Sequence, residues 1–242
     1  MGGGGFSMEP ENFLLDRFVL SIAAIPEPKV CFVGTASGDA QSYVDNFYAA
    51  FRTLPCAPAD LSLFKPPTAD LRSFVMEQDV IYVGGGNTRN LLVLWREWGL
   101  DTILREAWQS GVVLAGISAG SICWFQQGLS DSVIPGDLAP LDCLGFIPGS
   151  NSPHYDGEPG RRPAYHRFIS EGKLQAGYAA DDGAALHFIG EKLARVVSSR
   201  EAAKAYSVRR VGDEVEEVAL ETLWLGSTAR SPISTGIPST MG

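Results

Sequence analysis

The residue with the clearest chemical potential is a serine set between two glycines. Residues 116–120 read Gly-Ile-Ser-Ala-Gly, which fits the Gly-x-Ser-x-Gly pattern of a nucleophilic serine at a sharp strand-to-helix turn. Small flanking residues permit the close backbone approach that such a turn needs, and the following helix N-terminus offers backbone donors for an oxyanion. In a chain with 27 glycines the pentapeptide can also arise by chance. Ser118 is the candidate nucleophile, and the chemistry that it predicts is acyl transfer.

A serine nucleophile needs a base, and the chain has only three histidines. His154 falls in the irregular polar loop 151–157, where an imidazole can be held beside a serine. His166 lies in a helix-like stretch and His187 in a strand-like one, and surface or packing roles suit both better. We therefore expect His154 to act as the base.

The third member of such a site is a carboxylate that orients the imidazole and fixes its tautomer. Residues 180–183 read Ala-Asp-Asp-Gly at a predicted turn between strands, which is a good place to project a carboxylate. Asp131 and Asp156 are alternatives, because aspartates are common in exposed turns. The residues alone leave the choice of acid open.

A nucleophile of this kind must be carried by a strand that runs into a helix, and the hydrophobic pattern predicts that arrangement. Strands are expected at residues 29–33, 61–64, 79–83 and 111–117, and helices at 40–52, 69–78, from 87 onward, 101–110 and 119–126. Apolar runs at 176–178, 184–189, 194–198 and 205–208 are closely spaced, as in an antiparallel edge. The predicted fold class is α/β, with a mainly parallel sheet flanked by helices on both faces.

Length and composition fit one globular domain, with 242 residues, 45% hydrophobic and 19% charged. We expect this α/β domain to span residues 1–225, followed by a flexible tail over 226–242 that is rich in Ser, Thr, Pro and Gly. The formal charge of −9 argues against a nucleic-acid partner, since phosphate binding needs a basic face.

The cysteines and the apolar runs predict a compartment. Four cysteines without Cys-x-x-Cys spacing argue against a disulfide framework or a zinc site. The N-terminus lacks a signal-peptide pattern, and the longest apolar runs are shorter than the roughly 20 residues of a membrane span. The expected protein is cytoplasmic, with no membrane partner.

Three segments together resemble the peptidase E family, which also includes the cyanophycinases. They are Tyr-Val-Gly-Gly-Gly-Asn-Thr at 82–88, the serine pentapeptide at 116–120, and Ser-Pro-His-Tyr at 152–155. The resemblance runs from about residue 30 to residue 198, and the order serine, histidine, acid also matches that family. It implies a fold like that of the class I glutamine amidotransferases, with a serine at the turn.

The resemblance also implies an activity, which is hydrolysis of dipeptides with an N-terminal aspartate, without a metal or other cofactor. Ser118 and His154 match the family's nucleophile and base. Asp182 matches the family's acid, which is a glutamate in its best-known members. Because the aspartate is one methylene shorter, Asp131 remains the alternative acid.

Further site residues follow from the same resemblance. The oxyanion donors would be backbone N–H groups of Gly85 or Gly86 and of Ala119, although a glycine triplet can also be a plain turn after a strand. The arginine that binds the substrate carboxylate would be Arg162, with Arg161 as the alternative. Two arginines that balance nearby acidic residues on a solvated loop are the competing interpretation.

Asn87, which follows the glycines, is the remaining candidate for substrate binding. Relatives of this kind carry a short apolar strand ahead of the glycine run 2–5, whereas only Met1 precedes that run here. Without a strand before it, the run does not predict a dinucleotide site.

Two other functions remain compatible with the sequence. A related hydrolase would act on β-aspartyl peptides such as a β-aspartyl-arginine polymer, and a non-catalytic binding module could use the same fold. The expected partner is a small peptide substrate, and the pattern leaves a homo-oligomer open.

Overall fold

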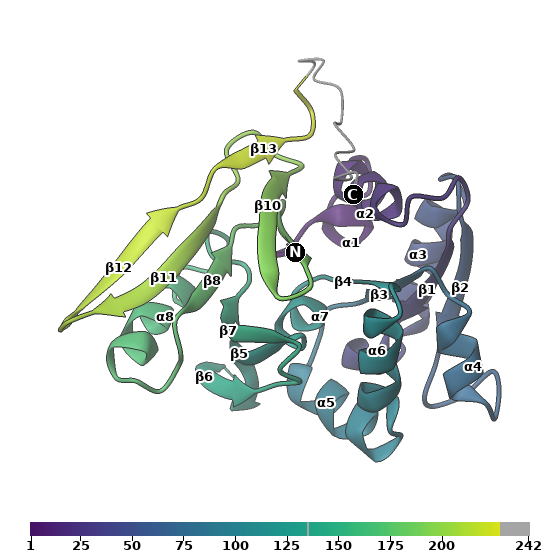
Figure 1. The fold of residues 1–242 in the computed structure, drawn as a ribbon, viewed down its shortest axis with the longest axis horizontal. Coiled ribbons are helices and arrows are strands. Elements are labelled where there is room, and N and C mark those ends of the chain that lie inside the picture. Colours follow the sequence, from purple (N-terminus) through teal and green to yellow (C-terminus); the bar gives the residue numbers. More distant parts are fainter. Residues whose placement is uncertain (135, 228–242) are drawn as a thin grey trace, which may run out of the picture.

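Three sheets organise the chain in the computed structural model, which describes residues 1–134 and 136–227 (Figure 1). The first sheet is parallel, with the strand order β2-β1-β3-β4. Its strands are β1 (Lys29–Val33), β2 (Ala57–Leu61), β3 (Val80–Val83) and β4 (Val113–Gly116). β3 is buried along its whole length and β1 beyond its first residue, as parallel strands covered on both faces must be.

Helices cover both faces of this parallel sheet, as the sequence predicted. Alternate side chains of β1 and β3 enter two separate hydrophobic clusters, one on each face. One cluster includes side chains of α1 (Gly5–Met8), α2 (Leu14–Ile22) and α3 (Gln41–Phe51). The other includes side chains of α4 (Leu71–Met76), α5 (Thr88–Glu97) and α6 (Leu100–Gln109). The short helix η1 (Thr35–Ser37) follows β1.

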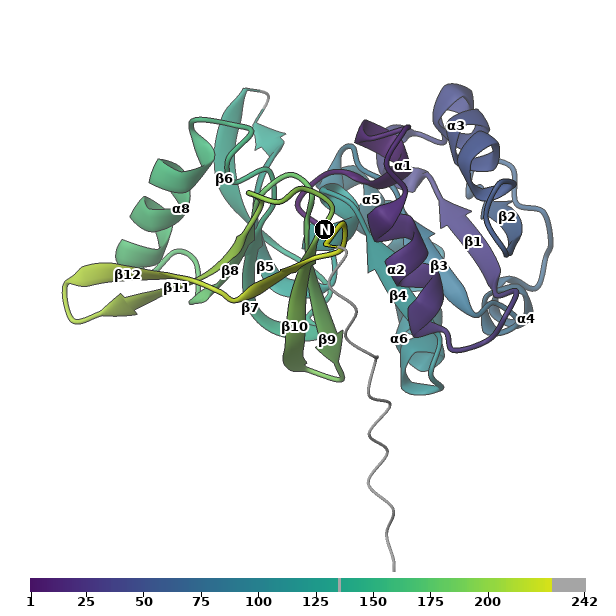
Figure 2. The ribbon, with the colours of Figure 1, turned by 90° about the horizontal axis from the view of Figure 1, so that it is seen from above.

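A second, six-stranded sheet lies beside the helical half of the molecule (Figure 2). Its order is β12-β11-β8-β7-β5-β6, and the pairs β5–β7 and β7–β8 are parallel while the other pairs are antiparallel. Its strands are β5 (Phe125–Ile134), β6 (Asp137–Asp142), β7 (Ile147–Ser152), β8 (Gly177–Ala180), β11 (Ala205–Val211) and β12 (Glu214–Ala219). Helix α8 (Arg161–Ser170) packs against this sheet.

The third sheet has three strands and includes β13, the last element within the described residues. It has the order β13-β10-β9, with β9 (Ala184–Ile189), β10 (Lys192–Ser198) and β13 (Thr222–Trp224). β9 and β10 are antiparallel, which agrees with the antiparallel pairing expected for this part of the sequence.

Two predicted elements differ from the structure. The strand expected at 61–64 lies earlier, at Ala57–Leu61, because backbone pairing with β1 overrides its weakly apolar sequence. The helix expected over 119–126 ends at Ile122 as α7 (Ala119–Ile122), since Phe125 already begins β5. Of the predicted tail, residues 228–242 lie outside the described residues.

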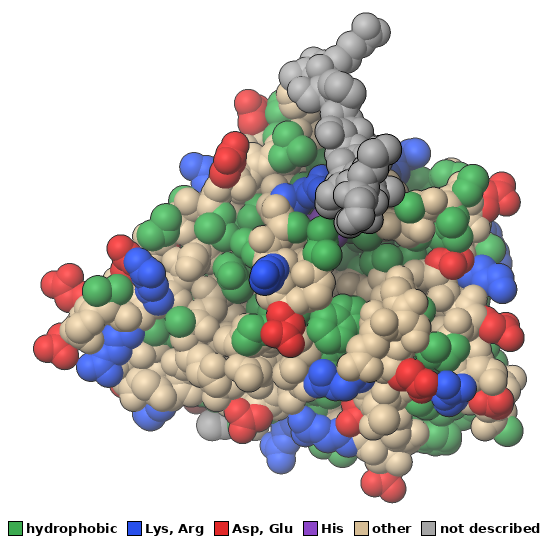
Figure 3. Space-filling view, viewed as in Figure 1, with side chains coloured by type: hydrophobic (Ala, Val, Ile, Leu, Met, Phe, Trp, Pro, Cys, Tyr) green, Lys and Arg blue, Asp and Glu red, His purple; other side chains and the backbone are tan. Residues whose placement is uncertain are grey.

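The surface and the helices carry two further observations. On the face shown in Figure 3, Lys and Arg side chains are interspersed with Asp and Glu side chains. Among the described residues, none of the helices combines the length and apolar character needed to cross a bilayer.

One carboxyl group lies inside the core against α1. Asp16 is fully buried and accepts a hydrogen bond from the hydroxyl of Tyr82 at 2.9 Å, while its Oδ2 has no partner among the described residues. Burial raises the pKa of Asp16 from 3.8 to about 6, and the hydrogen bond from Tyr82 offsets part of that rise. The folded state therefore binds this proton more tightly than the unfolded chain does.

Asp16→Asn should remove one component of the pH dependence of stability. Between pH 4 and pH 6 the folded wild type holds a proton that the unfolded chain has lost, so its stability falls as pH rises through this window and levels off above it. The accumulated loss is on the order of 3 kcal/mol relative to Asp16→Asn. Urea unfolding of both proteins from pH 4 to pH 7 measures it, with the exposed Asp213→Asn as a control that should follow the wild type. A stability difference between wild type and Asp16→Asn that does not change with pH would contradict this account.

Candidate active site

Ser118 occupies the strand-to-helix turn that the sequence predicts. β4 ends at Gly116 and α7 begins at Ala119, so the serine stands at the carboxyl end of the parallel sheet. Its backbone angles are φ 55° and ψ −113°, a conformation that residues with a Cβ rarely adopt. Such strain persists only where the surrounding structure holds it in place.

The two glycines of the pentapeptide are required by packing. A Cβ on Gly116 would lie 2.0 Å from the carbonyl oxygen of Gly120, and a Cβ on Gly120 would lie 2.3 Å from that of Val83. Both distances are far below any normal contact. The Gly-x-Ser-x-Gly pattern therefore reflects a helix start pressed directly against two strands.

The glycine triplet after β3 lies next to the serine. A Cβ on Gly85 would lie 3.3 Å from Cβ and 3.8 Å from Oγ of Ser118. The N–H of Gly85 donates to the hydroxyl of Tyr43 at 3.1 Å, so it is already engaged. The N–H groups of Gly86 and Ala119 make no hydrogen bond to any described residue, which leaves this pair as the free donors of the expected set.

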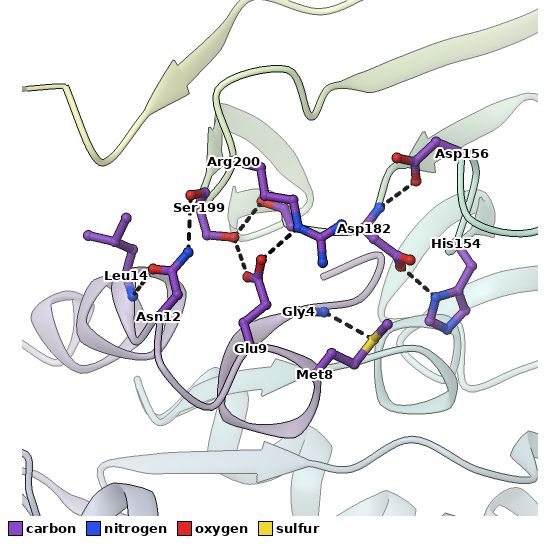
Figure 4. A network of polar contacts seen from close by, with 11 residues as sticks. Gly4, Met8, Glu9, Asn12, Leu14, His154, Asp156, Asp182, Ser199 and Arg200 are labelled. Carbon is purple, nitrogen blue, oxygen red and sulfur yellow. Dashed lines mark hydrogen bonds and ion pairs between the residues drawn. The ribbon is translucent and has the colours of Figure 1, made fainter.

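His154 and Asp182 meet because two neighbouring strands are parallel. β7 and β8 pair side by side, and each residue follows the carboxyl end of its strand by two positions. The N–H of Tyr155 donates to the carbonyl of Ala180 at 3.1 Å, which ties the two loops together. Nδ1 of His154 and Oδ1 of Asp182 are 2.7 Å apart, and Figure 4 shows the two groups facing each other.

The environment favours a charged Asp182. The side chains of His154 and Asp182 are 14% and 12% exposed, so their contact is largely shielded from water. The hydrogen bond with His154 lowers the pKa of Asp182 more than its burial raises it. Asp156 accepts the backbone N–H of Asp182 at 2.8 Å, whereas Asp131 is exposed and its carboxylate makes no hydrogen bond or ion pair within residues 1–134 and 136–227. Of the three candidate acids, the structure brings Asp182 to the imidazole.

Two links connect the serine turn to the histidine and the acid. The side-chain amide of Asn151, on β7, donates to Oγ of Ser121 on α7 at 2.9 Å. The carbonyl of Met1 accepts the N–H of Ser118 at 3.2 Å, and Gly3 forms a parallel β-bridge with Asp182. No hydrogen bond joins Oγ of Ser118 to His154 in the part of the chain described here, a contact that often tightens only when substrate binds.

The glycine run at the start of the chain belongs to this site, which the sequence analysis did not foresee. A Cβ on Gly2 would lie 2.3 Å from the carbonyl oxygen of Ala180, and a Cβ on Gly3 would lie 2.1 Å from Oδ1 of Asp182. Only glycine lets the chain pass this close to the acid. The glycine run 2–5 was the only sequence signal for this contact, but no spacing rule links such a run with Asp182, about 180 residues later.

Arg162 is held by partners within the protein. Its guanidinium lies over the rings of Tyr155 and Tyr206, 4.9 and 4.8 Å from their centroids, and 3.0 Å from the carboxylate of Glu217. His166 also contacts Glu217, at 2.8 Å. This cluster packs against the loop that carries His154, because Tyr155 directly follows His154 in the sequence.

Arg161 and Asn87 also have structural roles. Arg161 is 3% exposed, and its guanidinium donates to Glu158 at 2.7 Å and to the carbonyl of Leu129 at 3.0 Å. Asn87 caps α5 by accepting the N–H of Asn90 at 2.9 Å. Its side-chain nitrogen makes no hydrogen bond within the described ranges.

A separate apolar cavity of about 370 Å³ lies between β4 and β9. His187 lines it and packs edge-on against Phe18, in line with the packing role expected for that histidine. Neither Ser118 nor His154 is among its lining residues. No group of three or more His, Cys, Asp or Glu side chains that could hold a metal ion occurs in the described residues.

Known peptidases resemble this chain over most of its length. Residues 1–196 match the description of peptidase family S51. The uncharacterized peptidase YgaJ of Bacillus subtilis (strain 168) is 62% identical over 226 residues, which are 93% of this chain and 97% of that protein. Peptidase E of Pasteurella multocida (strain Pm70) is 28% identical over 200 residues, covering 79% of this chain and 80% of the relative.

Solved structures share the fold at low sequence identity. The crystal structure of a peptidase from an acI-B1 Actinobacterium has a TM-score of 0.66 and 18% identity, covering 91% of this chain and 95% of the other. A putative peptidase E protein from Listeria monocytogenes EGD-e gives a TM-score of 0.51 and 20% identity, covering 85% and 93%.

Ser118→Gly should be more stable than Ser118→Ala. Alanine keeps the Cβ that makes the turn costly, whereas glycine adopts φ 55° freely. Relief of about 1–3 kcal/mol of strain exceeds the extra backbone entropy of glycine, so we expect a net gain of about 1 kcal/mol. Urea denaturation of both variants measures the difference. A glycine variant less stable than the alanine variant would show that the turn carries no such strain.

Proposed function

Because the chain belongs to peptidase family S51 and is therefore a peptidase, we propose that it is a serine peptidase acting on dipeptides with an N-terminal aspartate. The carrying observation is the strained Ser118, at the start of a helix that is hydrogen-bonded to the strand leading to His154. The contact of His154 with Asp182 supports the same proposal, since an oriented imidazole is what a serine nucleophile needs.

The proposed reaction is acyl transfer in two steps. His154 removes the proton of Ser118, and Oγ attacks the carbonyl carbon of the aspartyl residue. The N–H groups of Gly86 and Ala119 stabilise the oxyanion, and His154 then protonates the amine as the C–N bond breaks. Water, deprotonated by His154, hydrolyses the aspartyl ester and restores the serine. Asp182 stabilises the imidazolium in both steps.

The proposed selectivity for aspartate needs a cation near the substrate's side chain. Arg162 is the candidate, because its side chain is 47% exposed whereas that of Arg161 is buried. A substrate carboxylate would have to replace Glu217 as its partner. The free amide nitrogen of Asn87 is the proposed second contact. The proposed place of action is the cytoplasm, whose reducing conditions suit four free cysteines.

Ser118→Ala should reduce the turnover of an Asp-X dipeptide by about 10³- to 10⁶-fold, because the acyl-enzyme can no longer form. The measurement is kcat for purified wild type and variant on a panel of Asp-X, Glu-X and Asn-X dipeptides. A fluorophosphonate probe should label the wild type and leave the variant unlabelled. Near-normal dipeptide hydrolysis by Ser118→Ala would overturn the mechanism.

With β-aspartyl peptides added, the same panel separates the other candidate functions. A protein that labels with the probe but cleaves only β-aspartyl peptides would be the related hydrolase. A folded protein that neither labels nor cleaves any substrate would be a binding module.

Asp182→Asn should lower kcat by about 10⁴-fold, because the amide stabilises the wrong tautomer of His154. Asp131→Asn is the matched control, and it should leave kcat close to that of the wild type because Asp131 lies exposed on β5. Steady-state kinetics on an Asp-X dipeptide compares the two. The reverse order of effects would assign the acid to Asp131.

A further inference from the structure

A mostly buried carboxylate outside the proposed triad, that of Glu9, holds together the segments around Asp182 (Figure 4). Glu9 accepts hydrogen bonds from Oγ of Ser199 and from Nε of Arg200, each at 2.6 Å. The side-chain amide of Asn12 donates to the carbonyl of Ser199 at 3.2 Å. These contacts join the segment after α1 to the turn after β10, across about 190 residues of sequence.

The burial of Glu9 makes this geometry rigid. Its side chain is 10% exposed, and a carboxylate removed from water this far needs charged or strong donors on both oxygens. Ser199 and Arg200 provide one donor to each oxygen. The guanidinium of Arg200 is thereby held at Nε, which fixes the path of the aliphatic part of its side chain.

That path passes directly over the residue after Asp182. A Cβ on Gly183 would lie 2.9 Å from Cγ and 3.0 Å from Cδ of Arg200. Ser199 donates its N–H to the carbonyl of Gly183 at 2.8 Å, and its Oγ, whose proton goes to Glu9, lies 3.3 Å from the same carbonyl oxygen. Gly183 has φ 84°, so the turn depends on a conformation that these contacts hold in place.

The charge of Arg200 also acts on the acid. Arg200 is close enough to stabilise the carboxylates of both Asp182 and Asp156. The pKa of Asp182 is lowered first by the hydrogen bond with His154, and the positive charges of Arg200 and Arg161 add to this. Arg200 therefore contributes both contact and charge to the acid turn.

We propose that Glu9 and Arg200 are positioning residues, in which Glu9 holds Arg200 across Gly183 and Arg200 keeps the carboxylate of Asp182 aimed at Nδ1 of His154. The effect on turnover rests on the proposed function. The effect on the titration of Asp182 is independent of the proposed function, because it follows from contacts present in the free protein.

The test compares Arg200→Met, Arg200→Lys, Glu9→Gln and the double variant Glu9→Gln/Arg200→Met. Arg200→Met should lower kcat on an Asp-X dipeptide by about 10- to 100-fold with KM changed less than about twofold, because a displaced acid turn misaligns the imidazole. By ¹³C NMR titration, the pKa of the Asp182 carboxyl should rise, since a cation is lost. Arg200→Lys should restore that pKa toward the wild-type value, because it restores the charge.

The double variant should be no worse than Arg200→Met alone, because the two residues act as one unit. Arg209→Met is the matched control, since Arg209 forms a similar pair with Glu216 at 2.5 Å on the exposed β11–β12 hairpin. It should leave kcat and the Asp182 titration unchanged.

Two results would overturn the inference. Wild-type kcat and an unchanged Asp182 titration in Arg200→Met would remove the positioning role. A rise in KM alone would make Arg200 a substrate-binding residue instead. If the wild type cleaves no Asp-X dipeptide, the proposed function fails, and the Asp182 titration in the same variants still decides the positioning role.

Discussion

The site depends on one constraint: residues 1–3 pass closely between the turn at Ser118 and the turn at Asp182. The carbonyl of Met1 accepts the N–H of Ser118, and two residues later Gly3 pairs with Asp182. No side chain fits at Gly2 or Gly3, because carbonyl and carboxylate oxygens already occupy that space. A strained serine on one sheet is thereby kept in a fixed relation to an acid on another.

Charge is distributed around the acid so that Asp182 stays ionised while it is mostly buried. Its carboxylate is hydrogen-bonded to His154, the positive charge of Arg200 acts on it from a distance, and its backbone N–H is bound by Asp156. The neighbouring Asp181 is in a different situation, because burial raises its pKa. The surroundings therefore shift the pKa values of two adjacent aspartates in opposite directions.

The parts of the structure that could be predicted are those with a local cause. The turn at Ser118 follows from glycines beside a strand and a helix, and β1 and β3 follow from short apolar runs. β7 reads Ile-Pro-Gly-Ser-Asn-Ser and has no strand pattern, so its pairing with β8, which joins His154 to Asp182, was not foreseeable. The same holds for the contact of Glu9 with Arg200, since only the folded chain brings these residues together. For Arg162, the sequence position favoured a role in substrate binding, but the sequence could not indicate that its guanidinium pairs with Glu217 on β12.

The division of the site between sheets has a consequence during biosynthesis. The strands and helices that carry Ser118 are complete about 60 residues before Asp182 leaves the ribosome, and Arg200 is made later still. A growing chain therefore contains the serine turn before His154 and Asp182 exist to face each other, and these two residues reach their positions only when β7 and β8 pair in the second sheet.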